Sequence, residues 1–365
     1  MEFVNHTSFP ANWCLGVRPD GRELLIVVAK ATYRLPQGDE VAELAEEQVP
    51  LVKADEFTGE PGLSATLYES DFAHHKPMCD VLVVGSAHAP GKGTRKLTVG
   101  LEVGPIRKRF EVLGDRVWSR RWFRTVVSGP KPFKTIPLSY DRAYGGTDTG
   151  AKPDKVRTYP ENPVGVGYYP LSRGKKLIGR PLPNTQEIGK GATRLKGKLR
   201  PMSFGPMSRN FAARVPFAGT YDQRWLDERA PHLPRDFDYG YFQSAPADQQ
   251  MPYPAGGEEV RLVNLTASGV MRFRLPRRDL PILIVPHEGD AVQLDPVVDT
   301  VVIEPDLGRM TSTWRASRPL SKDIFEVRQV VIARTLHDHA VETRWQDKVR
   351  YANLAEMVRA RRGAR

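Results

Sequence analysis

Cysteine is scarce in this sequence, because only Cys14 and Cys79 occur among 365 residues. Two thiols are too few for a disulfide framework and are compatible with a reducing compartment. Long hydrophobic runs are also missing. The longest early apolar run, 24–29, is far shorter than the roughly 20 residues of a membrane-spanning helix. The polar start through Ser8 does not resemble a secretory signal. We therefore expect a cytoplasmic protein with no membrane partner.

Acidic residues are outnumbered by basic ones. The chain has 54 Lys and Arg against 43 Asp and Glu, a formal net charge of +11. A positive field of this size favours an anionic partner, and charge alone does not choose among nucleic acid, a membrane surface and an acidic protein. With 40% hydrophobic residues, 14 Phe, 12 Tyr and 6 Trp, the composition excludes a disordered chain.

Alternating apolar and polar residues predict β-hairpins near both ends of the chain. In the first, apolar residues occupy every second position of 97–103 and return at 110 and 112, with Gly104 and Pro105 between them. Short β-branched runs are typical of more deeply buried strands. The predicted strands are, in order, 24–28, 81–84, the hairpin 97–112, the hairpin 260–275, and the hairpin 301–315 across a turn at 305–308.

The middle of the chain has a different composition. Residues 126–257 contain 16 glycines and 17 prolines, a quarter of the segment, together with 16 aromatic residues. Disordered segments are poor in aromatic residues, so we expect this region to be ordered but mostly irregular. A helical turn or two is predicted at Asp222–Arg229, which lacks glycine and proline and ends before Pro231.

These patterns predict a mainly β fold, in which an antiparallel β-sandwich or barrel-like core carries a large Gly/Pro/aromatic-rich irregular insertion. Two separate β domains are the alternative. A C-terminal helix is predicted over 336–362, where Val341, Trp345 and Val349 fall on one helical face. The predicted segments are 1–125 (first β part of the core), 126–257 (insertion), 258–335 (second β part) and 336–365 (basic helical tail).

No motif for catalysis, metal or cofactor binding is found at the required spacing. The glycine-lysine segments at 85–92 and 191–198 have five residues between their glycines where a phosphate loop has four. The histidines, Cys79 and carboxylates of 71–88 match no metal-ligand spacing. No G-x-S-x-G elbow occurs. We expect no catalytic residues, no metal and no cofactor, although an enzyme that uses loop carboxylates remains an alternative.

Three loop segments in the middle region have distinctive residues. Segment 140–146 (YDRAYGG) combines Asp141 with Gly145 and Gly146, and segment 161–167 (ENPVGVG) is a second glycine-closed turn. We predict structural turn roles for Asp141, Gly145, Gly146, Glu161, Asn162, Pro163 and Gly165. In 210–225, aromatic residues recur in a manner typical of protein interfaces.

These segments, in their order along the chain, resemble a bacterial family that was defined as a domain of unknown function. The resemblance covers residues from about 20 to 320. The ordered series of segments identifies the family more specifically than any single segment does. It is carried by 70–71 (SD), 76–77 (KP), 80–90 (DVLVVGSAHAP), 141–146 (DRAYGG), 161–165 (ENPVG), 182–184 (LPN), 204–206 (FGP), 218–222 (AGTYD), 225–226 (WL), 233–238 (LPRDFD), 245–250 (APADQQ), 263–266 (VNLT), 273–276 (FRLP) and 314–315 (WR).

Members of that family resemble adaptors or chaperones of the type VI secretion system. The resemblance implies a non-enzymatic cytoplasmic protein that binds a secreted effector or a PAAR-like protein and helps load it onto the VgrG spike. The family supplies no catalytic set to carry over. As partner-contact residues we predict Arg142, Tyr144, Tyr221 and Trp225. One alternative is a nucleic-acid-binding protein that uses the basic surface and tail, although we favour a protein partner. The other alternative is an enzyme that uses loop carboxylates.

Overall fold

The computed structural model describes residues 1–333 except 37, 151–154, 192–197 and 278. The predicted C-terminal helix and the basic tail lie outside the described residues. Within them, the chain divides into two compact units. Unit 1 comprises the described residues of Met1–Ser8, Asp279–Pro296 and Phe325–Arg365, and unit 2 comprises Phe9–Arg278 and Val297–Ile324. The predicted boundaries at 125, 257 and 335 stay predictions.

Unit 1 is a four-stranded sheet built from segments far apart in the sequence. Its strand order is β1–β26–β22–β23, and β1 pairs in parallel with β26. Leu283, Val285 and Val331 form a buried cluster on this sheet, with Val4 packed against them. The strands are β1 (Glu2–Asn5), β22 (Ile282–Pro286), β23 (Val292–Leu294) and β26 (Val327–Ile332).

Unit 2 contains a seven-stranded sheet that joins both ends of the predicted core. Its order is β19–β7–β24–β25–β3–β2, with β4 beside β3. Ten consecutive residues of β3 are buried, in keeping with an apolar run covered on both faces. The strands are β2 (Ala11–Val17), β3 (Glu23–Arg34), β4 (Glu43–Leu44), β7 (Cys79–Val83), β19 (Gln250–Met251), β24 (Val297–Glu304) and β25 (Arg309–Pro319).

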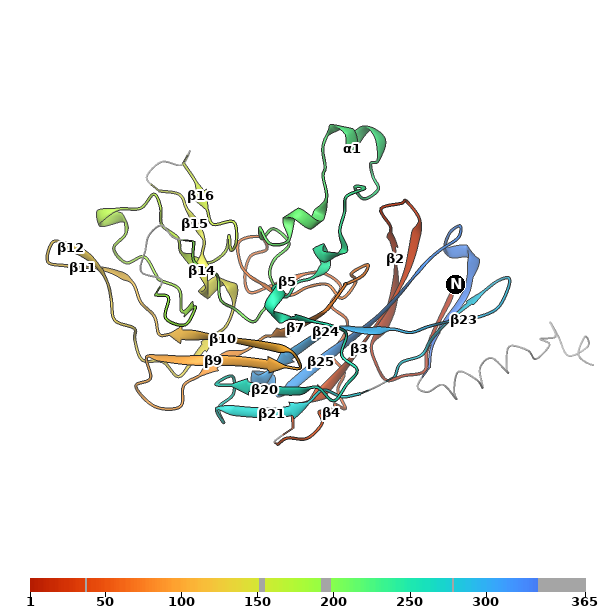
Figure 1. Ribbon diagram of the computed structural model, residues 1–365, viewed down its shortest axis with the longest axis horizontal. Coiled ribbons are helices and arrows are strands. Elements are labelled where there is room, and N and C mark those ends of the chain that lie inside the picture. Colours follow the sequence, from red (N-terminus) through yellow and green to blue (C-terminus); the bar gives the residue numbers. More distant parts are fainter. Residues whose placement is uncertain (37, 151–154, 192–197, 278, 334–365) are drawn as a thin grey trace, which may run out of the picture. The chain divides into compact units, whose positions relative to one another are not determined.

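A five-stranded sheet of unit 2 has the order β18–β10–β9–β20–β21, and its pairs are antiparallel. In Figure 1 the β9–β10 and β20–β21 hairpins are drawn in orange and cyan, so that this sheet also combines early and late parts of the sequence. The strands are β9 (Lys96–Val103), β10 (Ile106–Leu113), β18 (Thr185–Gln186), β20 (Glu259–Val263) and β21 (Val270–Arg274).

Short pairs complete unit 2. From Ser128 to Gly257, the described strands are two or three residues long, which fits the predicted irregular insertion. The two-stranded pairs of unit 2 are β5 (Glu56–Phe57) with β6 (Thr66–Tyr68), β8 (Ser86–His88) with β13 (Thr135–Pro137), β11 (Trp118–Arg121) with β12 (Arg124–Val127), β14 (Tyr144–Gly145) with β17 (Val166–Gly167), and β15 (Thr147–Asp148) with β16 (Arg157–Thr158).

Helices are few among the described residues. The α-helix α1 (Gln223–Glu228) lies within the predicted 222–229 segment. The short 3-10 helices are η1 (Tyr140–Arg142), η2 (Gly174–Lys176), η3 (Val215–Ala218), η4 (Tyr239–Phe242), η5 (Ala247–Gln249), η6 (Pro305–Leu307) and η7 (Ile324–Glu326).

The mainly β prediction is confirmed, and all three predicted hairpins are present. One feature of the large sheet departs from the antiparallel expectation. Strand β7 pairs in parallel with β24, with Asp80 opposite Thr300. Parallel neighbours need a long connection, and here more than 200 residues of chain lie between the two strands. Both large sheets have open edge strands in the described chain, so neither closes into a barrel by itself.

Candidate functional site

An open groove of about 560 Å³ lies beside η1 in unit 2. Its lining includes Tyr68 from β6, Ser86 from β8, and Asp141 and Arg142 from η1. The sequence singled out Asp141 as a turn residue and Arg142 as a partner contact. The structure places both of them at this groove.

Asp141 joins η1 to the loop before β6. One carboxylate oxygen accepts from the Ala65 backbone N–H at 2.8 Å, and the other accepts from the Thr58 hydroxyl at 2.5 Å and from the Ser139 hydroxyl at 3.3 Å. Arg142 donates to the Asn184 side chain at 3.1 Å and lies 3.8 Å from Asp115. Both side chains are therefore fixed by contacts within the fold.

The two glycine-closed turns interlock. Asn162 is buried, and its side-chain nitrogen donates to the carbonyls of Tyr140 at 2.9 Å and Tyr144 at 3.1 Å. Gly145 has φ +151° and Gly146 has φ +102°, and a Cβ at either position would overlap a backbone carbonyl oxygen of the opposite turn. Glycine is required there because only its backbone can approach so closely.

The other predicted turn residues fit the same arrangement. A Cβ on Gly165 would overlap the Asn162 side chain. Pro163 is half-buried next to Asn162, whereas Glu161 is exposed. The predicted turn motifs thus form one structural unit, in which β14 and β17 pair in parallel.

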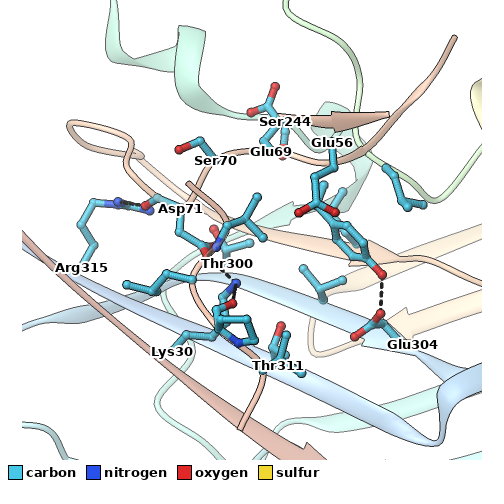
Figure 2. A pocket seen from close by; sticks show the side chains of 18 of the residues that line it. Lys30, Glu56, Glu69, Ser70, Asp71, Ser244, Thr300, Glu304, Thr311 and Arg315 are labelled. Atoms are coloured by element: carbon cyan, nitrogen blue, oxygen red, sulfur yellow. Dashed lines mark hydrogen bonds and ion pairs between the residues drawn. The ribbon is translucent and has the colours of Figure 1, made fainter. Parts of the chain in front are cut away.

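A cavity of about 200 Å³ adjoins the groove, and Leu67, Tyr68 and Glu304 line both. Figure 2 shows Lys30, Asp71 and Arg315 on one side of this cavity and Glu304 on the other. Val49, Leu51 and Val302 contribute apolar wall. The cavity therefore combines an apolar lining with several charged side chains.

These charges are paired with one another. The buried pairs Lys30–Asp71, Lys76–Asp80 and Arg315–Asp299, together with the half-buried Arg309–Glu304 pair, surround the cavity. A buried ion that loses its partner is strongly destabilising. This network is therefore first of all a structural feature of the large sheet.

Tyr68 lines both the cavity and the groove. Its hydroxyl donates to Glu304 at 2.5 Å, and Glu304 also accepts from Arg309 at 2.7 Å. Burial, followed by the hydrogen bond to Glu304 and its negative charge, raises the pKa of the Tyr68 phenol well above its ordinary value. The phenol remains protonated at neutral pH and acts as the donor in this hydrogen bond.

A second candidate site is the segment 214–243, which we call the α1 lobe. Its exposed apolar side chains are Val215, Phe217, Tyr221 and Leu226, of which Tyr221 is 54% and Leu226 57% exposed. The rings of Tyr221 and Trp225 meet edge to face at 4.7 Å, and Trp225 is half-buried. Figure 1 shows α1 at the end of two extended connections. The lobe therefore presents the predicted Tyr221–Trp225 pair at the surface.

Local contacts hold the α1 lobe in place. Asp222 is the N-cap of α1 and accepts from the Trp225 backbone N–H at 2.8 Å. At the base, the fully buried guanidinium of Arg214 pairs with Glu69 and donates to the Tyr241 carbonyl. Asp236 accepts two hydrogen bonds from Thr220, which lower the pKa of its carboxyl. The exposed rings are thus carried on a preorganised segment.

One of the predicted partner contacts needs revision. Tyr144 is only 1% exposed and packs against the rings of Tyr159 and Tyr168, so we no longer assign it to a partner surface. Arg142 lines the groove, which is separate from the exposed set on the α1 lobe. An aromatic residue in a loop can be covered by other loops, and the sequence alone does not indicate which rings are covered.

Asp148 is a carboxylate of the loop-rich region 126–257 and has structural contacts. Although burial opposes ionisation, hydrogen bonds from Leu171 and Ser172 lower the pKa of Asp148. Among the described residues, no three His, Cys, Asp or Glu side chains are grouped as metal ligands. His74 and His75 contact the rings of Phe242 and Tyr239, and burial lowers the pKa of both imidazoles. Both cysteines are free thiols.

Sequence reasoning missed two features. The Arg214–Glu69 pair joins residues 145 positions apart, and no local pattern indicates it. The exposed Trp122 and Phe123 at the end of the β11–β12 hairpin were also missed. Here a signal was available, because the two aromatic residues stand between arginines in 120–124 (RRWFR).

The described residues thus define a mainly β protein with a lobe that exposes several apolar side chains and with a charge-lined cavity. A family model matches residues 20–315, and its description is "uncharacterized protein conserved in bacteria (DUF2169)". This range covers well over half of the chain, so the chain belongs to this family. No curated protein and no solved structure matches it. In the described part of the chain, no helix has the length and apolar character needed to span a membrane.

Proposed function

We propose that this protein is a non-enzymatic cytoplasmic adaptor or chaperone of type VI secretion. In this proposal it binds a secreted effector or a PAAR-like protein and helps load it onto the VgrG spike. The series of motifs between about 20 and 320 supports the proposal through the resemblance described above, and the motifs of 141–146 and 161–165 contribute to it as a structural unit.

The observation that carries the proposal is the apolar surface of the α1 lobe. Tyr221 and Leu226 are more than half exposed on a segment fixed by a helix cap and a buried ion pair. Exposed apolar surface on a rigid support is typical of protein interaction sites, and aromatic residues are enriched at their energetic centres. Because the lobe is already ordered, binding requires little ordering of side chains and loops.

The test is co-purification with the effector or PAAR-like protein encoded beside this gene. Size-exclusion light scattering at about 150 mM and about 500 mM salt measures the complex, because exposed charge pairs are largely screened at the higher concentration. We expect a stoichiometric complex at both concentrations. The double substitution Tyr221→Ala/Leu226→Ser should weaken it at least about tenfold, as expected for central interface residues.

Leu63→Ser is the matched control, since Leu63 is an exposed leucine outside the α1 lobe. It should leave both the complex and the melting temperature unchanged. If the unaltered protein forms no complex with either neighbour at either salt concentration, the adaptor proposal fails. If the complex forms but Tyr221→Ala/Leu226→Ser binds normally, the adaptor function stands and the α1 lobe is excluded as its contact surface.

A further inference from the structure

The β11–β12 hairpin ends in a two-residue loop of exposed aromatic side chains. Trp122 is 84% and Phe123 90% exposed. Such loops usually carry Asn, Asp or Gly, because these residues tolerate positive φ. Trp122 instead adopts φ +55°, a conformation that bulky residues rarely take. Folding alone does not explain two large rings placed in water at this position.

Three arginines surround the loop. Arg121 and Arg124 are directly opposite each other in the last pair of the hairpin, so their side chains share a face. Like charges in that position destabilise a sheet. Arg120 donates from Nε to the Trp122 carbonyl at 3.2 Å, which stiffens the loop. In the described part of the chain, no carboxylate forms an ion pair with these three guanidinium groups.

The hairpin lies in a part of the sequence without acidic residues. Residues 116–140 and 162–186 contain no Asp or Glu, and the two segments are hydrogen-bonded to each other where the Trp118 N–H donates to the Arg180 carbonyl at 2.9 Å. Trp118 also packs with Leu177 and Leu182. The basic residues of the two segments are Arg116, Arg120, Arg121, Arg124, Lys131, Lys134, Arg173, Lys175, Lys176 and Arg180.

We propose that residues 120–124, the hairpin tip, form a second docking surface for an acidic protein with an apolar pocket bordered by carboxylates. The inference rests on the proposed function, since the partner is one of the proteins that an adaptor would join. Trp and Arg are the residues most enriched at the energetic centres of protein interfaces. Arg121 and Arg124 are Cα partners in the hairpin and so project from the same face. Guanidinium groups bind carboxylates in a bidentate manner, and such binding would relieve the repulsion between these two like charges.

The hairpin tip differs chemically from the α1 lobe. Helix α1 carries Asp227 and Glu228 beside Arg224, so its surface has mixed charge. The charged residues of the hairpin tip are all arginines. Arginine is preferred over lysine at interfaces that exclude water. Its two exposed rings and three arginines lie within five consecutive residues. Exposed rings suit an apolar pocket on a protein, whereas duplex DNA is bound chiefly through its phosphates and stable membrane anchoring requires a second signal.

The experiment measures binding to the effector or PAAR-like protein and to the spike protein encoded beside this gene, each by calorimetry at about 150 mM salt. We expect Trp122→Ser/Phe123→Ser to weaken one of the two complexes at least about tenfold. Arg121→Gln/Arg124→Gln should weaken the same complex and reduce its salt dependence. Because these substitutions remove exposed rings or like charges, the melting temperature should stay level or rise.

Two controls make the outcome specific. Lys92→Gln/Arg272→Gln removes two exposed positive charges elsewhere and should leave both affinities unchanged. Tyr221→Ala/Leu226→Ser tests the α1 lobe in parallel. Unchanged affinity of the tip variants for both proteins overturns the docking surface while leaving the adaptor function intact. If the unaltered protein binds neither protein, both proposals fall.

Other classes of partner give distinguishable results. Phosphatidylglycerol vesicles and duplex DNA are tested with the same variants at the same salt concentration. Binding to either one that depends on Trp122 and Phe123, with no protein complex that depends on them, assigns the hairpin tip to a membrane or to nucleic acid and overturns the acidic-protein proposal.

Discussion

At the scale of single residues, Asn162 is the centre of the interlocked turns. Its side-chain nitrogen donates to two carbonyls, and the side chain is fully buried. We expect Asn162→Ala to lower the free energy of unfolding by about 1–3 kcal/mol, because two buried carbonyls each lose a hydrogen bond, although the Tyr140 carbonyl still accepts from the Ala143 N–H. Urea unfolding measures the change. Glu161→Ala is the control, since Glu161 is exposed and its loss should change stability by less than about 0.5 kcal/mol.

Lys108 is a second residue with a measurable consequence. It is buried, lies 3.2 Å from Asp248 and donates to the Gln249 side chain at 2.6 Å. Burial lowers the pKa of its amine from 10.5 to about 8, although Asp248 opposes the shift. Between these two values the unfolded chain holds more protons than the folded one, so stability due to this group increases as pH rises.

Lys108→Met should remove that dependence. Between pH 8 and 10.5 the free energy of unfolding of the unaltered protein should rise by on the order of 3 kcal/mol relative to that of the variant. Below about pH 8 the difference between the two free energies should be constant. Asp248 keeps a partner in the variant, because Arg200 lies 2.7 Å from it. Unfolding free energies at pH 7, 8.5 and 10 test this expectation, with the exposed Lys190→Met as control. Parallel curves for Lys108→Met and the unaltered protein would contradict it.

At the scale of elements, α1 has only six residues and depends on its cap. Helices this short are marginal without tertiary support. We expect Asp222→Ala to cost about 1 kcal/mol of local stability, because the Trp225 N–H loses its acceptor. The variant should bind the partner more weakly without a change in melting temperature, as measured by calorimetry and circular dichroism.

The conservative substitution Asp222→Ser distinguishes positioning from direct contact. Serine is also a good N-cap, so binding should recover if Asp222 acts by ordering Tyr221 and Trp225. If Asp222→Ser binds as weakly as Asp222→Ala, the carboxylate itself contacts the partner and the positioning role is wrong.

Elements also differ in how far the sequence predicted them. The hairpins β9–β10, β20–β21 and β24–β25 were predictable, because alternation and turn residues are local signals. Pairing between β14 and β17 depends on contacts between two loops, and their glycines indicated turns but not the interlocking. The sequence placed Tyr144 and Tyr221 in the same class, although one is buried and the other exposed, because burial of a loop aromatic is decided by distant segments.

At the scale of the whole molecule, segments from both ends of the chain complete the same sheets. Strand β3 pairs with β25 over eleven residues, and β7 pairs with β24. The buried ion pairs Arg315–Asp299 and Lys76–Asp80 lie in this region, and the Lys76 amine also donates to Thr300. Cooperative unfolding of unit 2 follows from this arrangement, since its central sheet does not form until residues beyond 297 are in place.

Unit 1 should behave as a separate, weaker unit. Its sheet has four strands of three to six residues, whereas β3 of unit 2 has twelve residues with ten buried in succession. Smaller cores give lower free energies of opening. We therefore expect backbone amides of β26 to exchange with solvent at a lower free energy than those of β3, as measured by native-state hydrogen exchange in increasing denaturant.

The denaturant dependence of exchange supplies the decisive comparison. If unit 1 opens alone, amides of β26 and β22 should share one exchange free energy and a small dependence on denaturant, because little surface is exposed. Amides of β3 and β25 should share the larger global values. Val331 is buried, so Val331→Ala should lower the exchange free energies of the β22 and β26 amides by about 1–3 kcal/mol. The exchange free energies of the β3 and β25 amides should stay unchanged. A single exchange free energy for all four strands, shifted together by Val331→Ala, would show that the two units unfold as one.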